Sequence, residues 1–146
     1  MGRYVIPFFT FAMLWISVFS TDVLANEELS REEILQQRMA YYIHFGEFLV
    51  PWYYLAAIDQ YERNIQSVRS DIPKRDSVIA IQFSEEYWNG PLNSTDGDSP
   101  ASDISYFGGV GLDGNGDGIA DRNNDEDIIY TMASYLSQFG LEEENF

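Results

Sequence analysis

The sequence predicts a mainly α-helical domain that carries an acidic loop just before its last helix. Two stretches in the first half, residues 28–49 and 52–65, repeat apolar residues at helical spacing. A third stretch, DEDIIYTMASYLSQFG (125–140), does the same near the end of the chain. The 146 residues contain no internal repeat and have the length of one domain.

The composition argues against several classes of function. Twenty-four acidic residues against eight basic ones give a net charge of −16, whereas a nucleic-acid-binding protein needs a basic face for the phosphates. The chain has no cysteine, which excludes a disulfide framework, a Cys-ligated zinc site and a thiol nucleophile. Its one histidine, His44, excludes a His-rich zinc site and leaves Ser-His-Asp chemistry a single candidate base.

The amino terminus has the features of an export signal. Arg3 precedes an apolar run over residues 5–19, and Val23 and Ala25 supply the small residues of a cleavage site. The run is shorter than the roughly 20 residues that span a bilayer. We therefore predict a signal peptide over residues 1–25 and an exported, mature domain over residues 26–146, which contacts the membrane only through that signal. A retained anchor is the alternative.

The first two helices follow from local signals. Ser30 and Glu33 form a predicted capping box at the start of a helix that runs to about residue 49. Pro51 suits the first turn of a second helix over 52–65. Its apolar stripe is predicted to consist of residues at helical spacing: Tyr54, Ile58, Tyr61 and Ile65.

The second half alternates irregular and helical stretches. Residues 67–83 fit either a short extended segment or a helical turn, and residues 88–104 are predicted to form a long surface loop because they are rich in Pro, Gly and small polar residues. The final helix over 125–140 is predicted to end at Gly140. Its apolar positions are Ile128, Ile129, Met132, Tyr135 and Leu136.

The loop GLDGNGDGIADRNNDEDIIY (111–130) has the register of a calcium-binding loop. Counted from Asp113, oxygen ligands fall at the first, third, fifth and ninth places, and the seventh place offers a main-chain carbonyl. Gly118 stands at the sixth place, where such loops turn sharply. The predicted ligands of a structural Ca²⁺ ion are Asp113, Asn115, Asp117, Ile119, Asp121 and Asn124.

The loop departs from an EF-hand at its twelfth place. Asn124 stands there instead of a bidentate Glu, so that Asp125, Glu126 or Asp127 must supply the missing carboxylate. The alternative is an acidic loop whose charges simply face water.

This loop and the helix after it resemble a known family. The stretch FGGVGLDGNGDGIADRNNDEDIIYTMASYL is similar to the end of lytic transglycosylases of the lysozyme-like superfamily, including the membrane-bound lytic transglycosylase B family. Together with PWYYLAAIDQYERN, it resembles still more the amino-terminal region of Bacillus-type exported cell-wall hydrolases, where this region usually precedes a lysostaphin-type zinc peptidase domain. The resemblance covers roughly residues 35–140 and implies a lysozyme-like helical fold. The zinc peptidase domain is expected to be absent from this chain, because one histidine cannot build its metal site.

The resemblance points to Glu62 as the catalytic acid and base. In lytic transglycosylases the catalytic Glu ends a helix of the form Ala-x-x-x-x-Glu, which Ala57 to Glu62 match. Such a carboxyl group, its pKa raised by an apolar setting, protonates the glycosidic oxygen and then accepts the proton of the attacking sugar hydroxyl. Arg63 replaces the usual Ser or Thr, and a cation there would favour the ionised carboxylate. The alternative is a surface Glu on an amphipathic helix.

Other residues carry weaker signals. By resemblance, the Gly-rich turn of Gly108, Gly109 and Gly111 lines a sugar cleft, and Tyr135 faces the active site, although the periodicity alone places Tyr135 in the core. Asp59 is predicted to form an ion pair with Arg63 four residues later, and His44 to lie at the boundary of the core.

Three functions remain open at the level of the sequence. The first is an exported bacterial lytic transglycosylase that cleaves the glycan strands of peptidoglycan in the cell wall. The second is a non-catalytic glycan-binding domain that positions a peptidoglycan peptidase on the wall. The third is the function of a whole-length peptidase whose zinc domain this chain lacks. The sequence leaves the oligomeric state open.

Overall fold

The computed structural model describes residues 30–93 and 99–140 of the chain. The predicted signal peptide over 1–25 and the first residues of the mature domain lie outside these ranges. Within them, none of the helices has the length and apolar character that a membrane span requires.

The described chain is mainly helical, as the sequence predicts, with one two-stranded sheet. Its elements in order are α1 (Arg31–Leu49), α2 (Trp52–Val68), α3 (Glu85–Asn89), β1 (Ser99–Pro100), α4 (Ala101–Tyr106), β2 (Ile119–Ala120) and α5 (Asp125–Ser137). The two strands are antiparallel, and Ser99 lies opposite Ala120. A specifically lysozyme-like arrangement of these helices stays a prediction.

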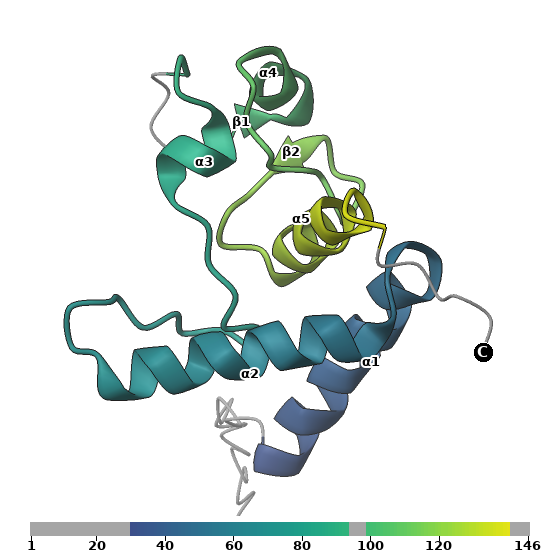
Figure 1. Cartoon of the computed structure of the whole chain (residues 1–146), viewed down its shortest axis with the longest axis vertical. Coiled ribbons are helices and arrows are strands. Elements are labelled where there is room, and N and C mark those ends of the chain that lie inside the picture. Colours follow the sequence, from purple (N-terminus) through teal and green to yellow (C-terminus); the bar gives the residue numbers. More distant parts are fainter. Residues whose placement is uncertain (1–29, 94–98, 141–146) are drawn as a thin grey trace, which may run out of the picture.

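The helices form two parts that meet at α5. In Figure 1, α1 and α2 form the lower part, α5 lies above them, and α3, α4 and the small sheet lie beyond α5. α5 packs against both α1 and α2. The core between these elements is apolar, and burying each of its large side chains contributes about 1.5–3 kcal/mol. Its fully buried members include Leu55, Ile79, Ile81, Trp88, Ile104, Ile128 and Ile129.

The start of α1 confirms the predicted capping box. The Ser30 hydroxyl accepts a hydrogen bond from the Glu33 amide at 3.2 Å, and the Glu33 carboxylate accepts one from the Ser30 amide at 2.7 Å. These two bonds satisfy donors that a helix start leaves unpaired. α2 begins at Trp52, as predicted, and Pro51 lies directly before its first residue rather than within the first turn. Both helices therefore begin where local sequence signals place them.

The predicted apolar stripe of α2 is wrong at Tyr61, whereas its other members, Tyr54, Ile58 and Ile65, are partly buried. Tyr61 is 64% exposed, whereas the buried positions of the helix are Leu55, Asp59 and Gln66. The inward face is partly polar because Asp59 and Gln66 bind main-chain groups of the segment that follows the helix. A search for apolar residues at helical spacing cannot find such a face.

The segments between α2 and α5 also differ from expectation. Residues 69–83 form neither a helix nor a strand, although Ile79 and Ile81 are fully buried. The stretch 88–104, predicted as a surface loop, contains the buried Trp88, strand β1 and the start of α4; residues 94–98 are not described. Elements this short are held by tertiary contacts of Trp88 and Ile104 rather than by local propensity. The predicted final helix is confirmed as α5, and Gly140 follows it with a φ of 68°.

Candidate functional site

Glu62 lies on the face of α2 that points toward the body of the domain. The same helix face carries Leu55, seven residues before Glu62, Asp59, three residues before it, and Gln66, four residues after it. These three side chains are buried, whereas Glu62 is only partly buried. Glu62 therefore points inward from the helix and still reaches solvent.

The carboxyl group of Glu62 is suited to holding a proton. Burial raises the pKa of Glu62 above its ordinary value, and the negative charge of Asp59 raises that pKa further. Among the described residues, the Glu62 carboxylate has no hydrogen-bond or ion-pair partner that would favour its ionised form. Both effects are those that a general acid needs.

Asp59, one turn earlier on α2, is surrounded by hydrogen-bond donors. Its Oδ1 accepts hydrogen bonds from the amides of Ala80 at 2.5 Å and Ile81 at 3.3 Å. Its Oδ2 accepts them from the Tyr42 hydroxyl at 2.7 Å and the Arg63 guanidinium at 3.0 Å. The side chain is 1% exposed. Four donors around a buried carboxylate make Asp59 a structural residue, and the predicted ion pair with Arg63 is confirmed.

The same contacts explain why Arg63 does not oppose an acid role of Glu62. The Arg63 guanidinium binds Asp59 and also the Val78 carbonyl oxygen at 2.9 Å. Adjacent residues on an α-helix point about 100° apart, and here the Arg63 side chain turns toward Asp59. Consistently, the pKa of Glu62 is raised rather than lowered.

The acidic loop is folded around its own carboxylates. Asp113 Oδ1 accepts hydrogen bonds from the amides of Gly116 at 2.6 Å and Asp117 at 3.1 Å, and its Oδ2 accepts one from Gly118 at 2.7 Å. Gly116 and Gly118 have φ values of 81° and 90°, which favour glycine. The turn at Gly118 therefore falls at the sixth place of the loop, where the calcium register expects it.

The remaining predicted ligands of the loop bind nearby amides in the same way. Asp117 Oδ1 accepts from the Ile119 amide at 2.8 Å, and its Oδ2 accepts from the Asn115 side chain at 3.1 Å. Asp121 Oδ1 accepts from the Asn123 amide at 2.6 Å. Across residues 30–93 and 99–140, no three Asp, Glu or His side chains converge closely enough to hold a metal. The predicted ligands thus share one loop, but their oxygens face main-chain N–H groups.

Asp127 fastens the loop to the start of α5. Its Oδ1 accepts hydrogen bonds from the amides of Gly114 at 2.8 Å and Asn115 at 3.2 Å, and its Oδ2 accepts one from Asp121 at 2.8 Å. The residue is 0% exposed. These three bonds occupy both oxygens from within the loop, so that Asp127 supports the loop from behind.

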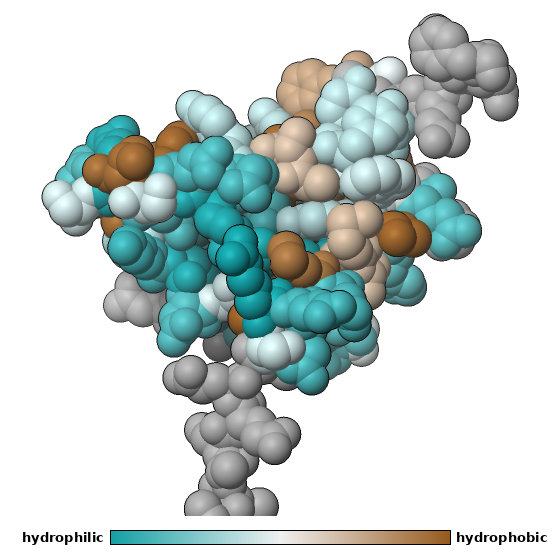
Figure 2. All heavy atoms as spheres, turned by 90° about the horizontal axis from the view of Figure 1, so that it is seen from below, coloured by the Kyte–Doolittle hydropathy of each residue, from teal (hydrophilic) through white to brown (hydrophobic). Residues whose placement is uncertain are grey.

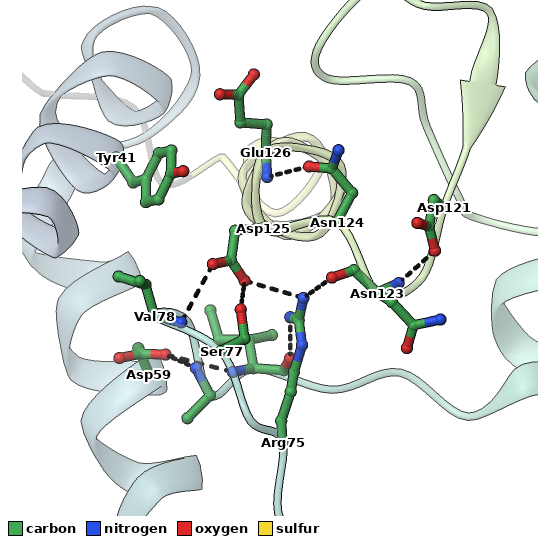
Figure 3. Close-up of polar contacts among 12 residues, drawn as sticks. Tyr41, Asp59, Arg75, Ser77, Val78, Asp121, Asn123, Asn124, Asp125 and Glu126 are labelled. Atoms are coloured by element: carbon green, nitrogen blue, oxygen red, sulfur yellow. Dashed lines mark hydrogen bonds and ion pairs between the residues drawn. The ribbon is translucent and has the colours of Figure 1, made fainter. Parts of the chain in front are cut away.

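Asp125 and Asn124 are also committed elsewhere. Asp125 accepts hydrogen bonds from the Ser77 hydroxyl and from the Val78 amide at 3.2 Å, and it forms a 2.9 Å ion pair with Arg75 (Figure 3). Asn124 caps α5 by accepting the Glu126 amide at 2.8 Å. The carboxylate of Glu126 itself points away from these contacts in Figure 3.

The glycines of the Gly-rich turn have different surroundings. A side chain at Gly109 would collide with the Trp88 carbonyl oxygen at 2.3 Å, and one at Gly111 with the Trp88 ring at 2.5 Å. Trp88 is buried and donates its Nε1–H to the Ala120 carbonyl at 3.1 Å. Close packing on Trp88 therefore accounts for Gly109 and Gly111, whereas Gly108 is exposed and has a φ of 77°.

Tyr135 belongs to a row of aromatic side chains that joins α3 to the end of α5. Its ring centroid lies 6.1 Å from that of Tyr87 and 5.1 Å from that of Phe139, and Phe83 stacks on Tyr87 at 6.2 Å. Tyr87 is 44% and Phe139 63% exposed. We call these four residues the aromatic row. Phe83 and Phe139 are not among the residues predicted from the sequence; both lie just outside the helices, so that helical spacing gives no signal for them.

The only histidine of the chain, His44, lies at the surface. His44 is exposed on α1, rather than at the core boundary, and its ring meets Phe45 edge-on at 4.8 Å. His44 therefore shows the surroundings of a surface residue.

The fold and the site together define a small helical domain with a partly buried carboxyl group, whose pKa is raised, and an aromatic row on its surface. A protein of Bacillus subtilis (strain 168), named L-Ala–D-Glu endopeptidase, is 40% identical to this chain over 134 residues. The similar region takes in 90% of this chain but 41% of that protein, so that the chain spans less than half the length of the relative. No protein-family model matches the chain, and no solved structure matches it.

Proposed function

We propose that this chain is the non-peptidase part of a peptidoglycan hydrolase and that it binds the glycan strands of the bacterial cell wall. A peptide bond between L-Ala and D-Glu is a feature of the peptidoglycan stem peptide, which links the relative to the wall. The single histidine and the lack of cysteine argue against a zinc peptidase site in this part. The predicted signal peptide over residues 1–25 would place the protein outside the cell.

The aromatic row is the observation that carries this proposal. Aromatic rings bury large apolar areas, and their faces can stack on the apolar faces of sugar rings. Tyr87 and Phe139 offer exposed rings; Phe83 stacks on Tyr87, and Tyr135 meets both rings edge-on.

Cosedimentation with purified, insoluble peptidoglycan tests the binding. The wild-type domain is expected to sediment with the polymer, and Tyr87→Ala and Phe139→Ala are each expected to weaken that binding about tenfold by removing a stacking surface. Tyr106→Ala is the matched control, because Tyr106 is an 82% exposed tyrosine on α4, a helix that carries no member of the row. Unchanged binding by both row variants would show that the aromatic row does not bind the glycan.

A second candidate function is glycan cleavage, and the state of Glu62 favours it. A partly buried carboxyl group whose pKa is raised is suited to protonating a glycosidic oxygen and then accepting the proton of the sugar's own 6-hydroxyl. No second carboxylate nucleophile is needed when that hydroxyl attacks, in contrast to ordinary retaining glycosidases. The domain would then be a lytic transglycosylase as well as a binding domain.

The products of peptidoglycan digestion separate the two functions. A transglycosylase leaves 1,6-anhydro ends, and Glu62→Gln is expected to abolish them while wall binding persists. Glu86→Gln, at an exposed carboxylate on α3, is the control and is expected to cleave normally. If the wild-type domain binds the wall and releases no anhydro product, the domain only binds.

The acidic loop is proposed to hold a structural calcium ion. Asp113, Asp117 and Asp121 supply the hard oxygen ligands that calcium prefers, with the Asn115 side chain and the Ile119 carbonyl in the expected register. Each carboxylate has about four acceptor sites, so that the bonds to main-chain amides leave lone pairs for an ion. Because Asp125 is bound to Ser77, Val78 and Arg75 outside the loop, Glu126 and Asp127 are the remaining candidates for the last carboxylate.

Thermal unfolding with and without calcium tests this ion. Binding to the folded state alone raises the melting temperature by mass action, with about 2.7 kcal/mol gained at a hundredfold excess over Kd. Millimolar CaCl₂ is expected to raise the melting temperature of the wild type but not of Asp117→Ala, and equimolar MgCl₂ is expected to act less. Equal behaviour of both proteins in calcium would contradict the site.

A further inference from the structure

The solvent-facing side of α2 carries no charged residue. Its exposed residues are Trp52, Tyr53, Ala57, Gln60, Tyr61, Asn64, Ser67 and Val68, which we call the α2 outer face. This is unusual in a chain of which 22% is charged. By contrast, α1, a helix of similar length, exposes Arg31, Glu32, Glu33 and Glu47. The lack of charge is therefore a local property of α2.

The α2 outer face lies on the opposite side of the helix from Glu62. Tyr53 and Glu62 are nine residues apart, which is half a turn out of phase at 3.6 residues per turn. Figure 2 looks onto the side of the molecule below α2 and shows scattered apolar patches among hydrophilic side chains. A ligand centred on Tyr53 would thus lie on the other side of the helix from Glu62, with Trp52 and Tyr61 at the edges of the face, and would meet no broad apolar surface.

The side chains of this face combine aromatic rings with amides. Trp52, Tyr53 and Tyr61 are 44%, 50% and 64% exposed, and the rings of Trp52 and Tyr53 lie 6.1 Å apart, nearly perpendicular. Gln60 Nε2 donates a 2.8 Å hydrogen bond to Asn64 Oδ1, which uses one donor and one acceptor and leaves the other amide atoms for a ligand. Tyr53 and Tyr61 are separated by about 12 Å along the helix, the length of a short run of sugar rings.

We propose that the α2 outer face is a second glycan-binding surface, which takes the uncharged N-acetylhexosamine backbone of a wall polysaccharide. The proposal rests on the proposed wall-binding function and adds a contact on the other side of the domain from Glu62. Aromatic rings stack on sugar faces, and the amides of Gln60 and Asn64 match the hydroxyl and acetamido groups of such a chain.

The chemistry of the face argues against other occupants. A membrane-bound helix presents Lys and Arg beside large aliphatic residues, and this face has no cation and a single large aliphatic side chain, Val68. A stable protein interface is centred on a continuous apolar area, whereas the rings here are interrupted by Gln60 and Asn64. Carboxylates, which would repel an anionic wall polymer, are absent from the face.

Titration with an N-acetylglucosamine hexamer tests the proposal, because this probe is uncharged and carries no peptide. The readout is the ¹⁵N chemical-shift change of the domain, which gives both the affinity and the residues contacted. The double variant Tyr53→Ala/Tyr61→Ala is expected to bind roughly tenfold more weakly and to lose the shifts over residues 52–64. Tyr106→Ala is the control for an exposed tyrosine elsewhere, and thermal unfolding of each variant verifies the fold.

The outcomes separate this inference from the proposed function. Unchanged affinity of the double variant, with wall binding intact and dependent on Tyr87, overturns the α2 surface alone. Failure of the wild type to bind either the hexamer or peptidoglycan overturns both proposals. Sedimentation velocity covers the remaining alternative: a wild-type dimer that the double variant dissociates would show that the face binds a second copy of the chain instead of sugar.

Discussion

The carboxylates of the acidic loop and the carboxylate of Glu62 lie in the same chain but differ in their hydrogen bonding. In the loop, Asp113 and Asp127 each accept three main-chain hydrogen bonds. On α2, the carboxylate of Glu62 has no such donor among the described residues, and its pKa is raised by burial and by Asp59. Burial raises the pKa of Asp127 as well, although its three hydrogen bonds act in the opposite direction. Hydrogen bonds of this kind stabilise an ionised carboxylate, whereas desolvation favours the protonated one.

The difference separates structural acids from acids that are available for chemistry. A residue count would treat all 24 acidic side chains alike, yet their roles follow from the number of donors around each one. Asp59 shows this most clearly, because it lies one turn from Glu62 and is held by four donors. Replacing each acid and measuring the free energy of unfolding tests this comparison.

The largest effect is expected at Asp59. Asp59→Ala leaves the Ala80 amide and the Arg63 guanidinium without their buried acceptor, which is expected to cost about 3–5 kcal/mol of unfolding free energy. Urea denaturation measures the loss. Glu62→Gln, a change at a carboxylate of the same helix, is the control. A loss below about 1 kcal/mol at Asp59 would show that its four bonds are not structural.

An intermediate effect is expected at Asp127. Asp127→Ala removes the acceptor of three loop amides, which are partly accessible to water, and is expected to cost about 2 kcal/mol. Asp76→Ala removes an equal charge at an exposed site and controls for the relief of like-charge repulsion. If both variants have the same urea midpoint, the loop does not depend on Asp127.

The smallest effect is expected for Glu62→Gln, and its sign depends on pH. Because the folded-state pKa of Glu62 is raised, the wild type loses stability as pH rises through that pKa, whereas the Gln variant does not. Below the ordinary Glu value of 4.5 the two proteins should be equally stable, and at neutral pH the variant should be equal or more stable, within about 0.5 kcal/mol. A variant clearly less stable than the wild type at pH 7 would mean that Glu62 is a structural acid like Asp59.

The parts of the fold that the sequence predicts are those set by neighbours along the chain. The capping box of Ser30 and Glu33, the start of α2 after Pro51 and the course of α5 all depend on residues within one or two turns. The ion pair of Asp59 and Arg63 is of the same kind, since it joins residues four positions apart.

The parts that could not be predicted depend on contacts distant in sequence. Asp59 meets the amide of Ala80 across 21 residues, and Asp125 meets that of Val78 across 47. These contacts hold a buried segment in which apolar residues do not recur at a regular spacing. They also make the inner face of α2 polar, and for this reason the apolar spacing wrongly predicts that Tyr61 faces inward. The aromatic row likewise joins residues of α3 and α5 that only the folded chain brings together.

The bonds of Asp59 have a consequence for the dynamics of the irregular segment over residues 69–83. The amides of Ala80 and Ile81 belong to no helix or strand, yet both are bound to a buried acceptor. Their protons can exchange with solvent only when the segment leaves α2, an opening that also exposes Ile79 and Ile81. In a hydrogen-exchange measurement these two amides should therefore be protected as strongly as those in the middle of α5, so that a stretch without regular structure belongs to the slowest-opening unit of the protein.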